Sequence, residues 1–175
     1  GIRYTEHFDV DTYWSLNFRN CNFEGEFYVS FLKWMRRCPN LLSLSFVFSD
    51  EHWATKGGNG RVTSDDRERL AHLVGEAAAT IKFLTLENAL TTAGMRKFLT
   101  LVQMQPLEGL ALRSHAWTDG VNGDLDVLCG MLSRREHSLE LDINGTISPV
   151  NRLRLLDLTG GGLGDMGAAN VLQAA

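Results

Sequence analysis

The sequence predicts an α/β fold in which one strand–helix unit is repeated about six times along the chain. Three observations predict it. A short apolar pattern, Leu-x-x-Leu-x-Leu or a close variant, recurs along the chain, and a stretch with helical spacing of apolar residues follows most copies. Copies lie at spacings close to those of known repeat folds. Because a strand that is followed by a helix and then by another strand returns in the same direction, the repeat predicts one parallel sheet.

Size and composition are those of one globular domain. The chain has 175 residues, of which 44% are hydrophobic and 22% charged, and its formal net charge is -4. These values exclude disordered and fibrous classes. Without a basic cluster, the chain is not expected to bind nucleic acid by preference. No run of apolar residues is long enough for a membrane-spanning helix, so no membrane association is expected.

The three cysteines, Cys21, Cys38 and Cys129, are odd in number, far apart and without a Cys-x-x-Cys pair. This pattern disfavours both a disulfide framework and a zinc site. It favours a reducing compartment, and we therefore expect an intracellular, cytoplasmic protein. Cys21 occupies a position where the repeat accepts asparagine or cysteine, which favours a structural role over a reactive thiol.

Six copies of the strand pattern are identified by their central leucines, which are Leu16, Leu44, Leu84, Leu110, Leu139 and Leu156. Their separations are 28, 40, 26, 29 and 17 residues. Within the separation of 40, the glycines and the lack of periodicity predict an inserted loop at residues 49–62. The separation of 17 is too short for a complete unit. Either the copy at Leu139 lacks its helix, or residues are missing near 144–152, and the sequence leaves both explanations open.

Three stretches have the spacing of amphipathic helices. Their apolar faces are Phe27, Phe31, Leu32, Trp34 and Met35; Leu70, Leu73, Val74 and Ala77; and Met95, Phe98, Leu99 and Val102. The polar cluster at residues 63–66 is expected to cap the second helix, and Thr91 or Thr92 the third. A further helix-like stretch, AANVLQAA, ends the chain.

The first and last copies match the longer pattern Leu-x-x-Leu-x-Leu-x-x-(Asn/Cys)-x-Leu most fully, as YWSLNFRNCNF and LRLLDLTGGGLGDMG. Through them, residues 13–175 resemble leucine-rich repeat proteins, with TLENALTTAG and LDLTGGGLGDMG closest to the ribonuclease-inhibitor type. The junction RRCPNLLSL is similar to the cysteine-containing repeats of F-box adaptor proteins. Two copies depart from the pattern at the asparagine position. In the copy at Leu84, Asn88 lies one place before this position, and in the copy at Leu110, His115 occupies it.

The resemblance implies a horseshoe-shaped solenoid with a parallel concave β-sheet and convex helices. Residues 1–12 are then an N-terminal cover segment, residues 13–175 form the repeat domain, and the array is incomplete at the C-terminus, so that it continues in a longer chain or is covered by a partner. Because successive strand residues alternate faces, the residues between the leucines are expected on the concave wall.

The candidate partner-binding residues lie on this wall and in the inserted loop. They are Asn17, Arg19, Trp53, Thr85, Glu87, Arg113, Glu140, Asp142 and Asp157. The wall is also expected to include Ser45, Ala111 and Thr159. Basic residues lie toward the first copies and acidic ones crowd the last two, which favours a protein partner over a polyanion. Trp53, in the Gly-rich loop, is either an anchor for a partner or folds back on its own domain.

No residue on the wall has the character of a nucleophile, and the histidines lack metal-ligand spacing, so no catalytic residue, metal or cofactor is predicted. Gly162, Gly164 and Gly167 spell the dinucleotide motif Gly-x-Gly-x-x-Gly, which would indicate an oxidoreductase. The motif needs a second strand with an acidic residue about 20 residues on, whereas the sequence ends eight residues after Gly167. Gly167 also falls where the repeat predicts a glycine.

We therefore expect a non-catalytic scaffold that binds a partner protein through the concave face and the inserted loop, within a larger assembly. The resemblance leaves two alternatives. One is a regulator of a GTPase, similar to the Ran-type GTPase-activating proteins. The other is a substrate-recruiting subunit of a ubiquitin ligase, which RRCPNLLSL indicates.

Overall fold

The computed structural model describes residues 15–21, 26–35, 37–38, 40–50, 52, 64–77, 80–102, 107–118, 123–133, 139–141, 147–149 and 153–174. The predicted N-terminal cover segment lies outside these residues, as do Asp142 and most of the inserted loop with Trp53.

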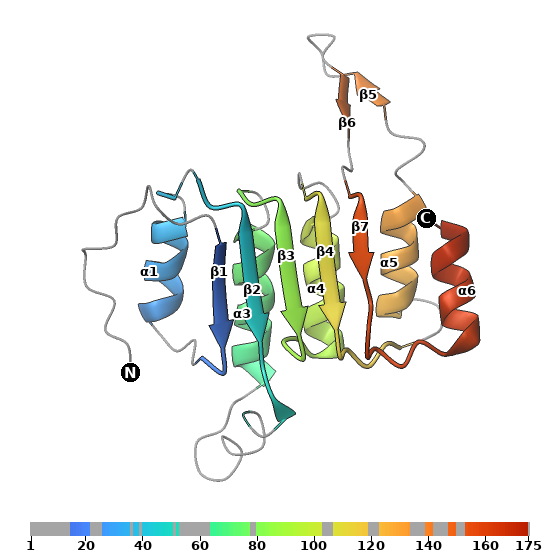
Figure 1. Cartoon of the computed structure of the whole chain (residues 1–175), viewed down its shortest axis with the longest axis horizontal. Helices are drawn as coiled ribbons and strands as arrows, with labels where there is room; N and C mark the ends of the chain where they lie inside the picture. Colours follow the sequence, from blue (N-terminus) through green and yellow to red (C-terminus); the bar gives the residue numbers. More distant parts are fainter. Residues whose placement is uncertain are drawn as a thin grey trace.

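Five parallel strands form one sheet in the order β1-β2-β3-β4-β7 (Figure 1). The strands are β1 (Ser15–Arg19), β2 (Ser43–Val47), β3 (Phe83–Glu87), β4 (Gly109–Arg113) and β7 (Leu155–Asp157). One register runs through all four pairings, so the central leucines Leu16, Leu44, Leu84, Leu110 and Leu156 lie side by side. The parallel sheet predicted from these copies is confirmed.

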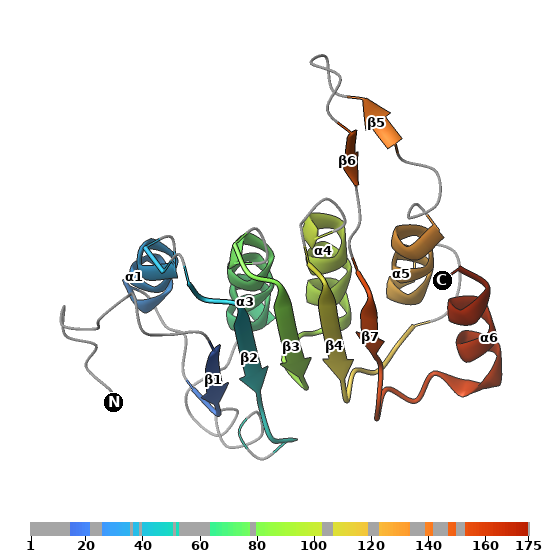
Figure 2. The same cartoon turned by 45° about the horizontal axis from the view of Figure 1, so that its top comes forward.

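Helices alternate with the strands and pack beside one another in a second layer. They are α1 (Glu26–Met35), α3 (Ser64–Ala77), α4 (Thr92–Val102), α5 (Asp124–Ser133) and α6 (Gly164–Ala174). Helices α1, α3, α4 and α5 lie in a row on one side of the sheet, α6 lies beside α5 beyond the β7 edge, and no described helix lies on the opposite face (Figure 2). The described residues therefore form a two-layer α/β structure in which one face of the sheet carries none of the described helices.

The core lies between the sheet and the helix layer. Leucines at alternate strand positions, such as Leu44, Leu84 and Leu112, are fully buried, because successive strand side chains point to opposite faces. The predicted apolar faces of α3 and α4 are buried against them. At the β1 end, Phe18 stacks on Phe46 with ring centroids 5.2 Å apart. Phe31 of α1 meets both rings edge-on, so aromatic packing closes this end of the described core.

The start of α4 agrees with its predicted cap, whereas the start of α3 is shifted relative to the predicted one. The hydroxyl of Thr91 accepts a hydrogen bond from the backbone N–H of Gly94 at 3.0 Å, so Thr91, of the two threonines considered, caps α4. Helix α3 begins at Ser64, within the polar cluster that was expected to precede it.

Among the described residues, three that are not glycine adopt the left-handed conformation directly after a strand. Asn20, Asn88 and Ser114 have φ of 48°, 47° and 53°, and each lies four residues after its central leucine. Gly160, with φ of 70°, holds the same position after β7. This explains the early Asn88: asparagine tolerates the left-handed turn that ends the strand. The following position, which the repeat assigns to asparagine, holds the buried Ala89.

The copy predicted at Leu139 does not join the parallel sheet. Strand β5 (Leu139–Leu141) pairs antiparallel with β6 (Ile147–Pro149) in a separate two-stranded ribbon between α5 and β7 (Figure 1). A parallel neighbour needs a crossover of about a dozen residues or more, whereas antiparallel strands join through a short turn. The expectation of about six stacked units is thus corrected to five strands. The long connection from β4 to β7 contains α5, which is not among the three helices predicted from the apolar spacing.

Candidate functional site

The sheet face opposite the helices, called here the open face, carries three rows of side chains in register. The middle row is Asn17, Ser45, Thr85, Ala111 and Asp157. The row toward the strand ends is Arg19, Val47, Glu87 and Arg113, and the row at the strand starts is Ser15, Ser43, Phe83, Gly109 and Leu155. Because the strands share one register, residues far apart in sequence form a continuous surface.

Most of the predicted partner-binding residues lie together on this face. Asn17, Arg19 and Arg113 are exposed, and Thr85, Glu87 and Asp157 are half-buried. The others do not join them: Glu140 lies on β5 in the separate ribbon, and Asp142 and Trp53 lie outside the described residues.

Two expectations about this face are therefore wrong. Since Glu140 is not in the sheet, the predicted crowding of acids in the last two copies is reduced to Asp157 on the described face. Ala111, predicted to be exposed, is only 6% accessible, because its short side chain lies below the level of its neighbours on a central strand.

Arg113 and Asp157 bind each other across β4 and β7. The Nη2 atom of Arg113 lies 2.7 Å from Oδ2 of Asp157, and Nε donates to the same oxygen at 2.8 Å. The other oxygen, Oδ1, accepts from the backbone N–H and the hydroxyl of Thr159. The Thr159 N–H, the Arg113 side chain and the Thr159 hydroxyl hold the pKa of Asp157 below its usual value. The charge of Asp157 is thus partly neutralised by groups of the chain itself.

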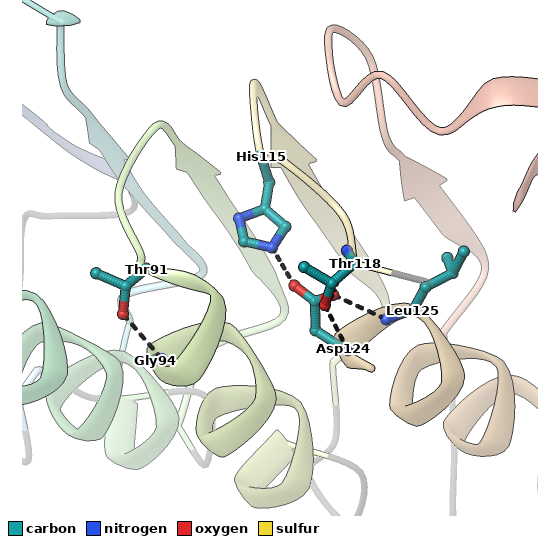
Figure 3. Close-up of polar contacts among 6 residues, drawn as sticks. All are labelled: Thr91, Gly94, His115, Thr118, Asp124 and Leu125. Carbon is teal, nitrogen blue, oxygen red and sulfur yellow. Dashed lines mark hydrogen bonds and ion pairs between the residues drawn. The ribbon is translucent and has the colours of Figure 1, made fainter. Parts of the chain in front are cut away.

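A buried polar cluster lies at the start of α5, below the strand ends (Figure 3). His115 is 6% accessible and Asp124 is fully buried. The Nε2 atom of His115 contacts Oδ2 of Asp124. The Oδ1 atom accepts from the backbone N–H of Thr118 at 2.7 Å, from its hydroxyl at 2.6 Å and from the N–H of Leu125.

Asp124 acts as a cap rather than as part of a catalytic site. Burial raises the pKa of Asp124, but the hydrogen bonds from His115 and Thr118 together outweigh burial and lower it. In a hydrolytic triad the hydroxyl donates to the imidazole, whereas here the hydroxyl of Thr118 donates to the carboxylate. The side chains of His115 and Asp124 are also shielded from solvent. The cluster therefore orients the β4–α5 connection.

Sequence reasoning assigned His115 to the asparagine position but missed its partner. The signal was present, since Asp124 directly precedes the helical spacing of Leu125, Leu128 and Leu132. An aspartate before such a stretch is a typical helix start.

Two cysteines and one glycine that the sequence singles out, Cys21, Cys129 and Gly167, lie in environments that indicate structural roles. The Sγ atom of Cys21 donates to the carbonyl of Arg19 at 3.3 Å, and burial raises the pKa of the Cys21 thiol. Burial and the nearby Asp126 likewise raise the pKa of Cys129. A side chain at Gly167 would come within 3.2 Å of Leu125, so this glycine permits close packing of α6 on α5.

Across the described ranges, no group of histidine, cysteine, aspartate or glutamate residues is placed to hold a metal ion. Among the same residues, no helix combines the length and the apolar character needed to cross a membrane. Comparison of the chain with protein-family models, with curated proteins and with solved structures finds no match.

Proposed function

We propose that the chain is a non-catalytic leucine-rich repeat protein that binds a partner protein through the open face of its sheet. The observation that carries this proposal is the two-layer arrangement, in which no described helix covers the open face (Figure 2), where Asn17, Arg19 and Arg113 are exposed. The repeat assignment is supported by the constant register of four strand pairings and by the buried leucines at equivalent positions. In this proposal the open face is the concave wall of a solenoid.

The chemistry of the open face favours a protein as the partner. Arg19 and Arg113 are cationic, whereas Glu87 and Asp157 are anionic, so neither sign of charge dominates the described face. A polyanion needs a surface of mainly positive potential. Mixed charges fixed on paired strands instead select a partner with a complementary pattern.

Capture of proteins by the tagged full-length chain, followed by mass spectrometry, identifies the partner. A GTPase among the captured proteins would support the regulator alternative, and a Skp-type adaptor would support the ubiquitin-ligase alternative. Affinity for the identified partner is then measured with two variants of the open face. Arg19→Glu reverses an exposed charge, and Thr85→Arg places a long cation at the centre of the middle row.

Both variants are expected to weaken binding by about tenfold or more, because replacement of a residue that carries binding energy in an interface has an effect of this size. The matched controls are Arg96→Glu and Thr100→Arg, which make the same changes at exposed positions of α4 in the helix layer. If the two open-face variants bind like the wild type, the proposal is wrong.

We also propose the inserted loop, residues 49–62, as a second contact, on the basis of its sequence alone. Trp53→Ala then lowers affinity for the partner while thermal stability stays constant. Unchanged affinity together with lower stability would instead make Trp53 part of the chain's own packing.

A further inference from the structure

Two large apolar side chains are exposed next to each other on the open face. Among the described residues, four large hydrophobic side chains are exposed: Phe83 at 43%, Leu155 at 58%, Met166 at 76% and Leu172 at 79%. Met166 and Leu172 belong to α6 in the helix layer. Phe83 and Leu155 belong to strands β3 and β7, where both pair in register with Gly109 of β4 between them.

Gly109 allows these two side chains to approach each other. A Cβ atom at this position would lie 2.6 Å from Cδ1 of Phe83 and 3.7 Å from Cδ2 of Leu155. The ring of Phe83 therefore lies over the backbone of β4, in space that a side chain would otherwise fill. Phe83, Gly109 and Leu155 form one apolar strip across three strands, called here the Phe83–Leu155 strip.

Packing within the sheet explains only part of this strip. An aromatic ring that covers a glycine on the neighbouring strand stabilises a sheet, which accounts for the position of Phe83. It does not account for Leu155, which leaves more than half of its surface in water. Adjacent exposed apolar side chains with a charged rim are typical of interaction sites.

The rim of the strip is positively charged. Lys82 and Arg154 immediately precede Phe83 and Leu155, and Glu108 precedes Gly109. Lys82 binds Glu108, with Nζ 3.0 Å from Oε1, and Arg154 is exposed. The rim therefore has two cations and one carboxylate, and that carboxylate already pairs with Lys82. A bound segment with its own carboxylate next to an apolar side chain would complement both features.

We propose that the partner docks an extended segment on the open face, with an apolar side chain on the Phe83–Leu155 strip and an adjacent carboxylate at Lys82 and Arg154. This inference rests on the proposed function and names the contact and its chemistry. A second copy of the chain fits less well. Strip-to-strip contact about a two-fold axis would bring the two cationic rims together, and like charges at an interface cost affinity.

The experiment uses a displayed library of random dodecapeptides that is selected on the full chain. Affinities of the selected peptides are then measured for Leu155→Ser and Arg154→Glu. The matched controls are Leu172→Ser, which makes the same change at an exposed leucine of α6, and Arg96→Glu on α4. Thermal unfolding of each variant separates loss of binding from loss of folding, and Leu155 is exposed enough for its replacement to leave the fold intact.

Selected peptides are expected to carry an aromatic or aliphatic residue beside aspartate or glutamate. They should bind Leu155→Ser and Arg154→Glu about tenfold or more weakly than the wild type, and bind both controls like the wild type. Selection of basic peptides, selection of none, or equal binding to Leu155→Ser overturns the inference. So does a wild-type dimer in sedimentation that Leu155→Ser dissociates, because the occupant is then a second copy.

The same variants distinguish failure of this inference from failure of the proposed function. If Leu155→Ser leaves the affinity of the peptides unchanged but Arg19→Glu or Thr85→Arg abolishes binding, the peptides bind elsewhere on the open face. Only the inference about the Phe83–Leu155 strip is then refuted. Peptides that no open-face variant affects refute both proposals.

Discussion

Replacing Asp124 with alanine tests how strongly the start of α5 depends on one buried carboxylate. Four groups share this carboxylate: the imidazole of His115, the N–H and hydroxyl of Thr118, and the N–H of Leu125 (Figure 3). In Asp124→Ala these groups lose their partner, and one of them, the imidazole of His115, is buried. The helix also loses its first cap.

The size of the effect follows from these two losses. Removal of a helix cap costs about 0.5–2 kcal/mol. A buried donor left without a partner costs about 1–3 kcal/mol. Because both losses come from the same carboxylate they are not independent, and we expect the free energy of unfolding to fall by about 2–4 kcal/mol. For a chain of this size, such a loss lowers Tm by about 10 °C.

Urea unfolding followed by circular dichroism measures the change. The control is Asp126→Ala, which removes an exposed carboxylate from the same helical turn and should change stability by less than about 0.5 kcal/mol. If Asp124→Ala and Asp126→Ala unfold at the same urea concentration, the carboxylate does not organise α5 and the reasoning is refuted.

The same site predicts a pH dependence. The lowered pKa of Asp124 means that the folded chain holds the carboxylate form more strongly than the unfolded chain does. This contribution to stability is complete above the ordinary aspartate pKa of about 3.9 and is lost as the pH falls through the lower folded value. The stability advantage of the wild type over Asp124→Asn should therefore be present at about pH 5 and shrink below about pH 4. An advantage that stays constant down to acid unfolding would contradict the assigned pKa direction.

Four further predictions concern the sheet, its turns and helix α5. Gly109→Ala forces away the aromatic ring that lies over it and should destabilise the chain by about 1–3 kcal/mol in urea unfolding. Gly130→Ala, in helix α5 with nothing within 4 Å of the added carbon, should stabilise it by about 0.4–1 kcal/mol, and a loss there would refute the packing argument. A double-mutant cycle of Arg113→Ala and Asp157→Ala should give a coupling of about 0.2–1 kcal/mol that weakens with salt; zero coupling at low salt would contradict the ion pair. Asn88→Ala should cost about 1–2 kcal/mol more than Asn88→Gly, because only glycine keeps the left-handed turn without strain, and equal costs would refute that origin.

The sequence by itself determined the units that build the sheet. Leucines at alternate positions specify which strand face is buried, and the same spacing around Leu44, Leu84 and Leu110 specifies a common register. Helical periodicity located α3 and α4, and Thr91 and Thr92 were the two candidates for the start of α4, of which the structure selects Thr91. These features depend on residues that lie a few positions apart, so they can be predicted from one sequence without knowledge of long-range contacts.

Tertiary structure alone decided which copies share the sheet and which side chains meet across it. The copy at Leu139 has a suitable local pattern but pairs with a neighbouring segment, because a short connection allows an antiparallel ribbon. Arg113 binds Asp157, which lies 44 positions away in the sequence. Phe83 and Leu155 both lie close to Gly109, on the strand between them. Such pairings depend on the spatial order of strands that the chain joins through helices. Local periodicity specifies the face on which a residue lies, but only the folded sheet specifies its neighbours.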